Sequence, residues 1–278
     1  MKVAVKETNS YLTKSKIGQY AINPYVGCPH ACKYCYASFM KRFTAHTEPW
    51  GEFLDIKTAK KRIDTSKIIG KNVFIGTVTD GYNPYESEYR ITRSILEQLV
   101  GVDCYLQIAT KNKLILQDID ILKQMKHLSV AVSINTLDDG FRQDMDKASS
   151  ISDRLDTLRI LHENGIYTIL FMSPIFIGIT DWKGIIEASR EFVCEYWFED
   201  LNLRGSYKTV ILQYVRGHYP EYYPLYERIY QKGDITPLTY MECEIISYCR
   251  DNKISFSDYF HHKDVISNPQ NKVLGKNR

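Results

Sequence analysis

Three cysteines stand within eight residues near the front of the chain, in residues 23–37 (NPYVGCPHACKYCYA). They are Cys28, Cys32 and Cys35. Thiolates this close can bind one inorganic centre if the chain loops around it, and they suit zinc or iron–sulfur clusters. A structural zinc site needs four protein ligands, and His30 is the neighbour that would complete one. A [4Fe–4S] cube held by three cysteines instead leaves one iron open to another ligand.

The other four of the seven cysteines are scattered along the chain. Cys104 stands near the start of an expected strand, Cys194 ends an expected helix, and Cys243 and Cys249 share the last expected helix. Their spacing does not favour an auxiliary cluster, and buried free thiols are the simpler interpretation. The N-terminus has no apolar segment with a cleavage signal, so we expect a cytoplasmic protein with reduced thiols.

The composition of the 278 residues is that of an ordinary globular protein. The 44% hydrophobic and 25% charged residues exclude a disordered, collagen-like or coiled-coil chain. A net charge of +3 neither indicates nor excludes a nucleic-acid-binding protein. The longest apolar stretch, residues 169–179, contains Ser173, Pro174 and Gly178 and is far shorter than the ~20 residues of a membrane span. We therefore expect no membrane association.

Strand-like apolar runs alternate with amphipathic helical runs through the middle of the chain. The expected strands cover residues 72–77, 103–110, 127–133, 167–173 and 195–201. The expected helices cover residues 90–100, 114–125, 152–164 and 182–194. Ser152 is the expected N-cap of the third helix, Gly165 follows its end, and Pro237 begins a last helix to about Arg250. This alternation predicts an α/β fold with a parallel sheet or barrel.

Polar residues directly follow four of these strands, in residues 77–80 (TVTD), 110–112 (TKN), 133–135 (SIN) and 173–174 (SP). The carboxyl ends of parallel strands meet at one edge, where functional residues of such folds gather. We therefore expect these side chains to lie together at that edge.

The spacing C-x3-C-x2-C, with Tyr34 directly before the third cysteine, resembles the signature of the radical S-adenosylmethionine (SAM) superfamily. The resemblance implies a partial (β/α)6 TIM-like barrel, with the cysteine loop just after the first strand. Its segments GCPHACKYCYA, TVTDGYNP, TKN, VSIN and SDRLDTLRILHENGI–SPIFIGIT resemble the branch related to spore photoproduct lyase. Within that branch, NPYVGCPHACKYCYASFMKRF followed by HTEPWG resembles the radical SAM mobile pair protein B group. The resemblance covers roughly residues 20–200.

The resemblance implies a [4Fe–4S] cluster and SAM as cofactors. Reductive cleavage of SAM gives a 5′-deoxyadenosyl radical, which takes a hydrogen atom from a substrate. The protein binds and orients the reacting groups and excludes water from them. By resemblance, Cys28, Cys32 and Cys35 hold three irons, and the amino and carboxylate groups of SAM bind the fourth. Two alternative functions are DNA lesion repair of the spore photoproduct lyase type, by family proximity alone, and a non-catalytic zinc or iron–sulfur binding module.

The resemblance also implies which strand-end residues bind SAM. Thr79 and Asp80 stand where the family binds the amino group, which needs acceptors. Lys111 suits the carboxylate, and Ser133 and Asn135 suit the carboxylate or the ribose hydroxyls. Each has a structural alternative: a turn at residues 79–81, a solvated charge at Lys111, and a helix cap at residues 133–135.

Three further residues are candidate SAM contacts by resemblance. Tyr34 and Tyr36 flank Cys35 and would shield the cluster or stack near adenine, although ordinary packing is the alternative in a chain with 21 tyrosines. Arg154 opens the helix before the expected fifth strand. It would reach SAM or, alternatively, lie on the helix surface.

The sequence departs from the lyase at one place. Spore photoproduct lyase has a cysteine near the end of its second strand that returns a hydrogen atom to the DNA product. The matching residues here, 76–80 (GTVTD), contain no cysteine, so repair of DNA lesions by that route is doubtful. Expected partners are a reductant such as flavodoxin or ferredoxin and, by analogy with the group name, a second radical SAM protein. Nucleic acid is compatible but not indicated.

We expect one structural unit with an N-terminal segment (1–19), the barrel (20–205) and a C-terminal helical or irregular extension (206–278) packed on it. The tyrosine-rich residues 217–230 would stack bases or, as we favour, form a packed lid or a partner surface. Residues around the sixth strand would line a substrate pocket or belong to an edge strand: Glu199, Asp200, Asn202 and Arg204. His261 and His262 would be metal ligands or solvated side chains.

Overall fold

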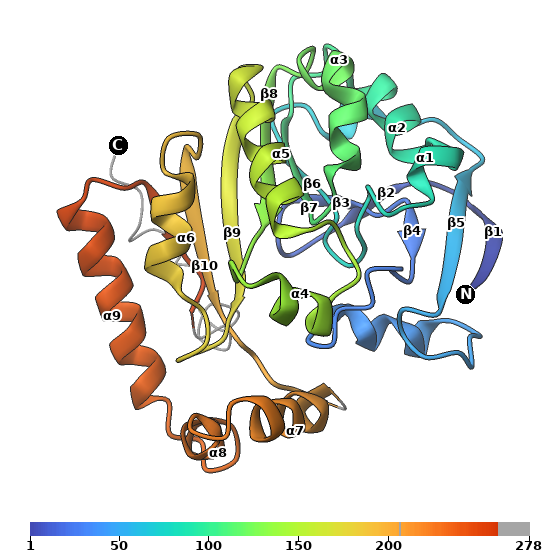
Figure 1. The fold of residues 1–278 in the computed structure, drawn as a ribbon. Helices are drawn as coiled ribbons and strands as arrows, with labels where there is room; N and C mark the ends of the chain where they lie inside the picture. The colour runs from blue at the N-terminus through green and yellow to red at the C-terminus, as the bar shows by residue number, and fades with distance from the viewer. Residues whose placement is uncertain (206, 261–278) are drawn as a thin grey trace.

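A computed structural model of the protein describes residues 1–205 and 207–260. Its largest element is an eight-stranded sheet of linear order, in which seven strands run parallel (Figure 1). The six strands of the expected barrel are β3 (Tyr20–Ile22), β6 (Asn72–Ile75), β7 (Tyr105–Thr110), β8 (His127–Ser133), β9 (Tyr167–Ile175) and β10 (Glu195–Asp200). The predicted α/β partial barrel is therefore confirmed, and the sheet formed by the described residues is open.

Two further strands extend the sheet at its ends. β11 (Phe256–Asp258) pairs in parallel with β10, and β2 (Leu12–Lys14) pairs antiparallel with β3. The interpretation of the sixth strand as an edge strand is therefore wrong, because β11 covers it.

The centre of the sheet is held by apolar side chains in register. Ile75 lies beside Ile108, and Ile108 beside Val130, and all three side chains are fully buried. Each such buried side chain stabilises the fold by about 1.5–3 kcal/mol. The polar residues that follow these strands are thereby fixed at one edge.

Helices on the crossovers cover the sheet, and α2 (Ile91–Leu99) packs through Thr92, Ile95, Leu96 and Leu99, which recur at helical spacing. The other helical segments before the C-terminal extension are η1 (Tyr36–Phe43), η2 (Thr65–Lys67), α1 (Glu86–Tyr89), η3 (Lys113–Asp118), α3 (Ile119–Leu122), α4 (Asp139–Met145), α5 (Ile151–Glu163) and α6 (Trp182–Ser189).

Three details of the predicted helices need correction. The expected helix over residues 114–125 is divided into η3 and α3, and α6 ends at Ser189, so Cys194 follows the helix instead of ending it. The N-cap at Ser152 is also wrong, because the Ser150 hydroxyl accepts the backbone N–H of Asp153 at 3.1 Å. Gly165 does follow the end of α5, with φ +75°.

A second, three-stranded sheet joins the N-terminal segment to the barrel. β5 (Phe53–Ala59) pairs in parallel with β1 (Lys2–Thr8) and antiparallel with β4 (Tyr25–Val26). The predicted boundary at residue 19 stays a prediction, but strand pairing crosses it through both β1 and β2.

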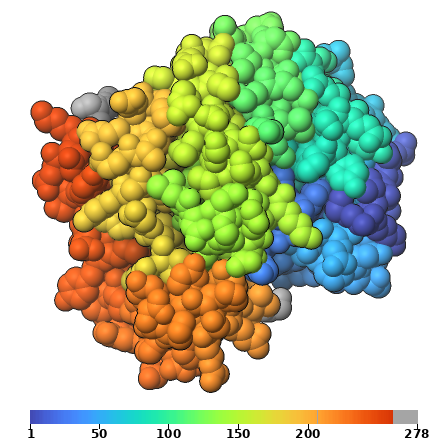
Figure 2. All heavy atoms as spheres, in the orientation of Figure 1, coloured from blue at the N-terminus to red at the C-terminus, as the bar shows by residue number. Residues whose placement is uncertain are grey.

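The C-terminal extension contains α7 (Tyr207–His218), α8 (Tyr223–Tyr230) and α9 (Thr236–Asp251). Figures 1 and 2 show α7 below the sheet and against α4, where the Tyr214 hydroxyl donates to Asp144 at 2.7 Å. In the tyrosine-rich segment Tyr226 is fully buried, and Tyr219, Tyr222, Tyr223 and Tyr230 pack against the core. This packing favours the lid over an exposed stacking surface. His261, His262 and the basic tail lie outside the described residues.

Candidate functional site

The three clustered cysteines lie in the loop between β4 and η1, which we call the cysteine loop (residues 27–35). The loop turns tightly at Gly27, whose φ is +86° and where a Cβ would lie 2.3 Å from the carbonyl oxygen of Phe53. All three thiols are free, with Cys28 buried and the other two half-buried. The backbone N–H of Cys35 donates to the carbonyl of Cys32 at 3.1 Å, so the loop doubles back on itself.

The environment of the thiols suits a bound cation. Burial, with the nearby Asp80 charge, raises the pKa of Cys28 to about 12, while backbone N–H groups of Asp80 and His30 oppose the shift. Burial also raises the pKa of Cys32 and Cys35, and Lys111 opposes it in both. Charge on the neighbouring cysteines adds to the raised pKa of Cys28 and Cys32.

The donor set fits a cluster with one open iron. Three free thiols share one loop, and backbone donors lie beside the sulfur of Cys28. His30, the considered fourth ligand, has its Nε2 3.0 Å from Asp80, and its buried Nδ1 has no hydrogen-bond partner among the described residues, so one ring nitrogen is left to meet a ligand.

Asp80 joins the cysteine loop to the ends of β6 and β7. Its buried carboxylate lies 3.0 Å from His30 Nε2 and accepts the backbone N–H groups of Lys111 and Tyr82, each at 2.8 Å. The Thr110 hydroxyl donates to it as well, at 2.9 Å. Burial alone would raise the pKa of Asp80, but these hydrogen bonds, first that from His30, hold it below its ordinary value. Both carboxylate oxygens are therefore occupied by the protein.

Thr79 makes a second connection to the same loop. Its hydroxyl donates to the carbonyl of Gly27 at 2.7 Å, and the side chain is buried. Thr79 and Asp80, which were predicted to bind the amino group of SAM, thus both make contacts with the cysteine loop. A turn at residues 79–81 alone does not account for these contacts.

The candidates on the next strand ends lie at the same edge. The Lys111 Nζ lies 5.7 Å from the ring centroid of Tyr34 and 3.4 Å from the carbonyl oxygen of Ser173. It is half-buried and is not a solvated loop charge. Ser133 is buried, and Asn135 donates to the carbonyl of Pro174 at 3.1 Å.

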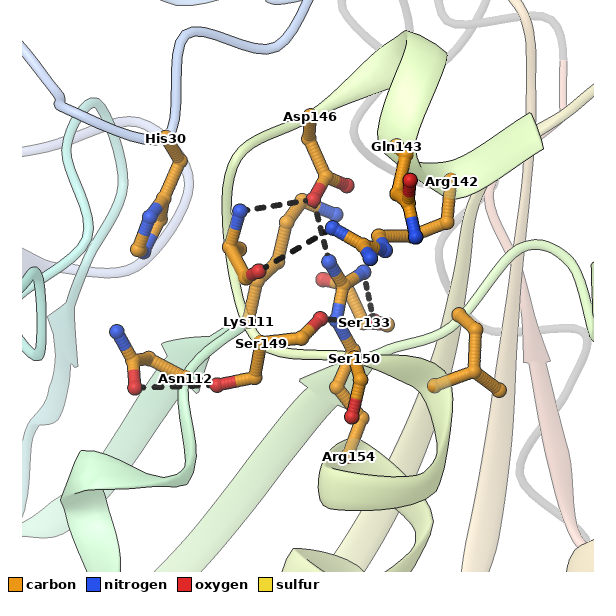
Figure 3. Close-up of polar contacts among 12 residues, drawn as sticks. His30, Lys111, Asn112, Ser133, Arg142, Gln143, Asp146, Ser149, Ser150 and Arg154 are labelled. Atoms are coloured by element: carbon orange, nitrogen blue, oxygen red, sulfur yellow. Dashed lines mark hydrogen bonds and ion pairs between the residues drawn. The ribbon is translucent and has the colours of Figure 1, made fainter. Parts of the chain in front are cut away.

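Arg154 lies under this edge with no exposed surface, so its interpretation as a helix-surface residue is wrong. Figure 3 shows its guanidinium between the carboxylate of Asp146 and the backbone of Ser133 and Ser149. Nε and Nη1 donate to Ser149 and Ser133 carbonyls at 2.9 and 3.2 Å, and Nη2 pairs with Asp146. The three nitrogens are thus bound within the protein.

Asp146, just after α4, is a residue that the sequence did not single out. It stands outside any recognisable motif, and only the fold brings it to Arg154. Its second oxygen accepts the Tyr34 hydroxyl at 3.3 Å. The adjacent backbone also holds the cysteine loop, since Lys147 N–H donates to the His30 carbonyl at 2.7 Å.

The two tyrosines that flank Cys35 have different environments. Tyr34 is buried and packs edge-on against Phe176, with ring centroids 5.8 Å apart. Tyr36 is 50% exposed, and its hydroxyl donates to the carbonyl of Thr77. Further along the edge, the Ser173 hydroxyl donates to Glu199, which brings the end of β10 to the site.

The other four cysteines lie apart from the loop. Cys104 and Cys249 are buried, Cys243 is exposed, and Cys194 lies 3.8 Å from His162 Nδ1. In the part of the chain that the structure describes, none of them completes a second metal group.

Comparison with protein families decides the class. Residues 22–187 match the model of the radical SAM superfamily. The chain belongs to this superfamily. It is therefore a radical SAM enzyme, which uses a [4Fe–4S] cluster and SAM and needs a reductant. The narrower mobile pair protein B group stays a prediction.

The similar proteins fall into two sets. An uncharacterised protein of Methanocaldococcus jannaschii is 34% identical over 77% of this chain and 81% of its own length. One of Mycobacterium bovis is 25% identical over 81% of this chain and 71% of its own. Among solved structures, spore photoproduct lyase complexed with dinucleoside spore photoproduct has a TM-score of 0.54 at 16% identity, covering 79% of this chain and 66% of the lyase.

A second solved structure supports the same fold. Streptococcus suis SuiB bound to S-adenosylmethionine has a TM-score of 0.54 at 13% identity, covering 94% of this chain and 50% of SuiB. The chain thus spans less than two thirds of the lyase and half of SuiB, and these likenesses concern the fold. No helix in residues 1–205 or 207–260 combines the length and hydropathy that a membrane crossing requires.

Proposed function

We propose that Cys28, Cys32 and Cys35 hold three irons of the [4Fe–4S] cluster and that SAM binds beside them at the carboxyl edge of the sheet. The observation that carries this is the cysteine loop itself, in which three free thiols, one buried and two half-buried, are tied to the strand ends by Thr79 and Asp80. When bound, the two cofactors supply the radical that abstracts hydrogen from substrate.

The residues of the chain divide into those that bind and those that position. In this proposal Lys111 meets the SAM carboxylate as a point charge. Its Nζ lies 5.7 Å from the ring centroid of Tyr34, and its charge opposes the raised pKa of Cys32 and Cys35, which supports this role. Ser133 and Asn135 offer polar groups at the next strand end, and Tyr36 presents an exposed ring beside Cys35.

Asp80 and Arg154 are positioning residues in this proposal. The carboxylate of Asp80 already accepts several protein donors, and the guanidinium of Arg154 is fully engaged. They act through the cysteine loop and through Ser133. The ring of Tyr34 is buried and packs edge-on against Phe176, and in this proposal it shields the site from water.

The cluster assignment is tested by anaerobic reconstitution of the full chain. We expect about four irons per chain and release of 5′-deoxyadenosine under dithionite. Cys32→Ala should lose both, whereas Cys243→Ala, which removes an exposed thiol elsewhere, should retain both. A Cys32→Ala protein that keeps its iron and still cleaves SAM would contradict the assignment.

The partners proposed are an electron donor such as flavodoxin or ferredoxin and a second radical SAM protein, with a cytoplasmic location that keeps the thiols reduced. Repair through a strand-end cysteine, as in the lyase, has no support in residues 76–80. There Thr77 accepts a hydrogen bond from Asn23 at 2.8 Å and Thr79 binds Gly27. We propose that the substrate binds near Ser173 and Glu199, which are hydrogen-bonded to each other at the same edge of the sheet.

A further inference from the structure

The short helix η1, which directly follows the cysteine loop, carries an exposed aromatic surface. Tyr36, Phe39 and Phe43 are 50%, 43% and 67% exposed, and all three belong to the eight residues of η1. Exposed apolar side chains that stand singly are ordinary on a monomer, whereas a local group of them marks a contact with another molecule. We call these three rings, with Lys41 and Arg42, the η1 surface.

Contacts within η1 hold this surface in shape. The guanidinium carbon of Arg42 lies 4.7 Å from the ring centroid of Phe43 and 5.4 Å from that of Phe39. The two rings meet edge to face, with centroids 6.4 Å apart. The Lys41 Nζ donates to the carbonyl of Thr47 at 2.9 Å. These contacts reduce the side-chain freedom that would be lost when a partner binds, which favours association.

The charge of this part of the chain has one sign. Residues 28–47 contain three lysines or arginines and no aspartate or glutamate. The next carboxylate along the chain, Glu48, is already in an ion pair. Lys41 and Arg42 contact a carbonyl and two rings, and neither forms an ion pair with any of the residues that the structure describes. The η1 surface therefore presents unpaired positive charge, which complements an acidic partner.

The η1 surface also adjoins a candidate cluster ligand. Tyr36 follows Cys35 directly in the chain, and the backbone N–H of Ser38 donates to the carbonyl of Cys35 at 3.3 Å. The Tyr36 hydroxyl donates to the carbonyl of Thr77, so η1 begins at the edge of the sheet where the site lies. Electron transfer between two proteins requires that their redox centres come close together. A protein that covers η1 meets this requirement, because it lies against the segment that holds Cys35.

We infer that the η1 surface is the docking site of a small acidic electron-carrier protein that reduces the cluster. This rests on the proposed function, which assigns Cys35 as a ligand and requires a reductant. In the docked complex one electron passes from the carrier, which is oxidised, to the cluster, which is reduced. Electron-transfer contacts between proteins are small, and a few rings around one arginine suit such a contact. A nucleic-acid strand would instead need cations spaced along a groove.

The test uses the reconstituted full chain with a flavodoxin as the acidic carrier. Arg42→Glu reverses the charge between the two rings, and Phe43→Ser removes the most exposed ring of the η1 surface. Lys16→Glu is the matched control, since Lys16 is exposed in the turn before β3 and so lies at the opposite edge of the sheet. The rate of cluster reduction by reduced flavodoxin is followed by stopped-flow absorbance. Dithionite, which needs no docking site, is the second reductant.

Arg42→Glu and Phe43→Ser should each lower the rate with flavodoxin at least about tenfold, because electrostatic steering or the ring contact is lost. Iron content and the rate with dithionite should match the wild type in both variants. Lys16→Glu should keep both rates near the wild-type values, since exposed charges farther apart than a Debye length are screened. Added salt should slow the wild type with flavodoxin and have little effect on Arg42→Glu.

Wild-type rates with flavodoxin in both η1 variants, or an equal loss in Lys16→Glu, would overturn the inference. A wild type that dithionite reduces and flavodoxin does not would also overturn it. So would loss of single-stranded oligonucleotide binding in the two variants with unchanged reduction by flavodoxin, which would assign the surface to nucleic acid. Wild-type protein that takes up no iron, or that dithionite cannot reduce, would instead overturn the proposed function. The two failures are therefore distinguishable.

Discussion

Two buried carboxylates hold the cysteine loop, Asp80 through His30 and Asp146 through Tyr34, and their partners differ in kind. Asp80 is surrounded by His30, the Thr110 hydroxyl and two backbone N–H groups. Asp146 is paired with Arg154, whose guanidinium is always charged, and also accepts the Tyr34 hydroxyl and the backbone N–H of Ala148. One carboxylate is stabilised by many small contributions and the other mainly by one full charge.

This difference predicts what is lost when the partners of each carboxylate are removed. A buried carboxylate that loses the cation paired with it costs more than the loss of any single neutral hydrogen bond. A carboxylate that accepts several donors loses a fraction of its stabilisation with each one. We therefore expect the pair of Asp146 with Arg154 to determine the stability of the fold. The contacts of Asp80 should instead determine the geometry of the cysteine loop.

The largest effect is expected for Arg154→Met, which keeps much of the side-chain volume and removes the charge. It should lower the free energy of unfolding by about 3–5 kcal/mol, because Asp146 stays buried without its partner. Denaturant unfolding of the cluster-free protein measures this. Arg190→Met, which removes a half-exposed arginine 3.3 Å from Glu187, should change stability by no more than about 0.5 kcal/mol. Equal effects of the two variants would contradict the comparison.

A smaller effect on stability is expected for Asp80→Asn. The amide can still accept some of the donors, but its NH2 group would face another donor, so we expect a loss of about 1.5–3 kcal/mol. Iron content after reconstitution should fall, because the contact with His30 in the cysteine loop is weakened. Asp103→Asn, at an exposed contact with His127, is the control. Full iron in Asp80→Asn would show that this side does not set the loop geometry.

The sequence allowed the parallel sheet to be predicted because its strands are continuous apolar runs. The run His127–Ser133 coincides with β8 from end to end. The pairing of β1 with β5 was not predicted, since the two strands are about fifty residues apart and each carries charged residues. Pairing over such a separation depends on the fold rather than on a local pattern.

The same limit applies to the site. Cys28, Cys32 and Cys35 could be singled out because their chemistry and spacing are local. The burial of Arg154 and its pairing with Asp146 could not, since helix periodicity places a residue on a face and does not reveal the loop that covers it.

The smallest effect is expected for Tyr34→Phe, which separates the two functions of this residue. It removes the 3.3 Å hydrogen bond to Asp146 and keeps the edge-on contact with Phe176. The loss should be about 0.5–1.5 kcal/mol in unfolding, because the pair with Arg154 continues to stabilise the carboxylate. Iron content should stay at the wild-type value, since the ring still excludes water from the cysteine loop. A loss as large as that of Arg154→Met would mean that the hydroxyl, and not the guanidinium, is the main partner of Asp146.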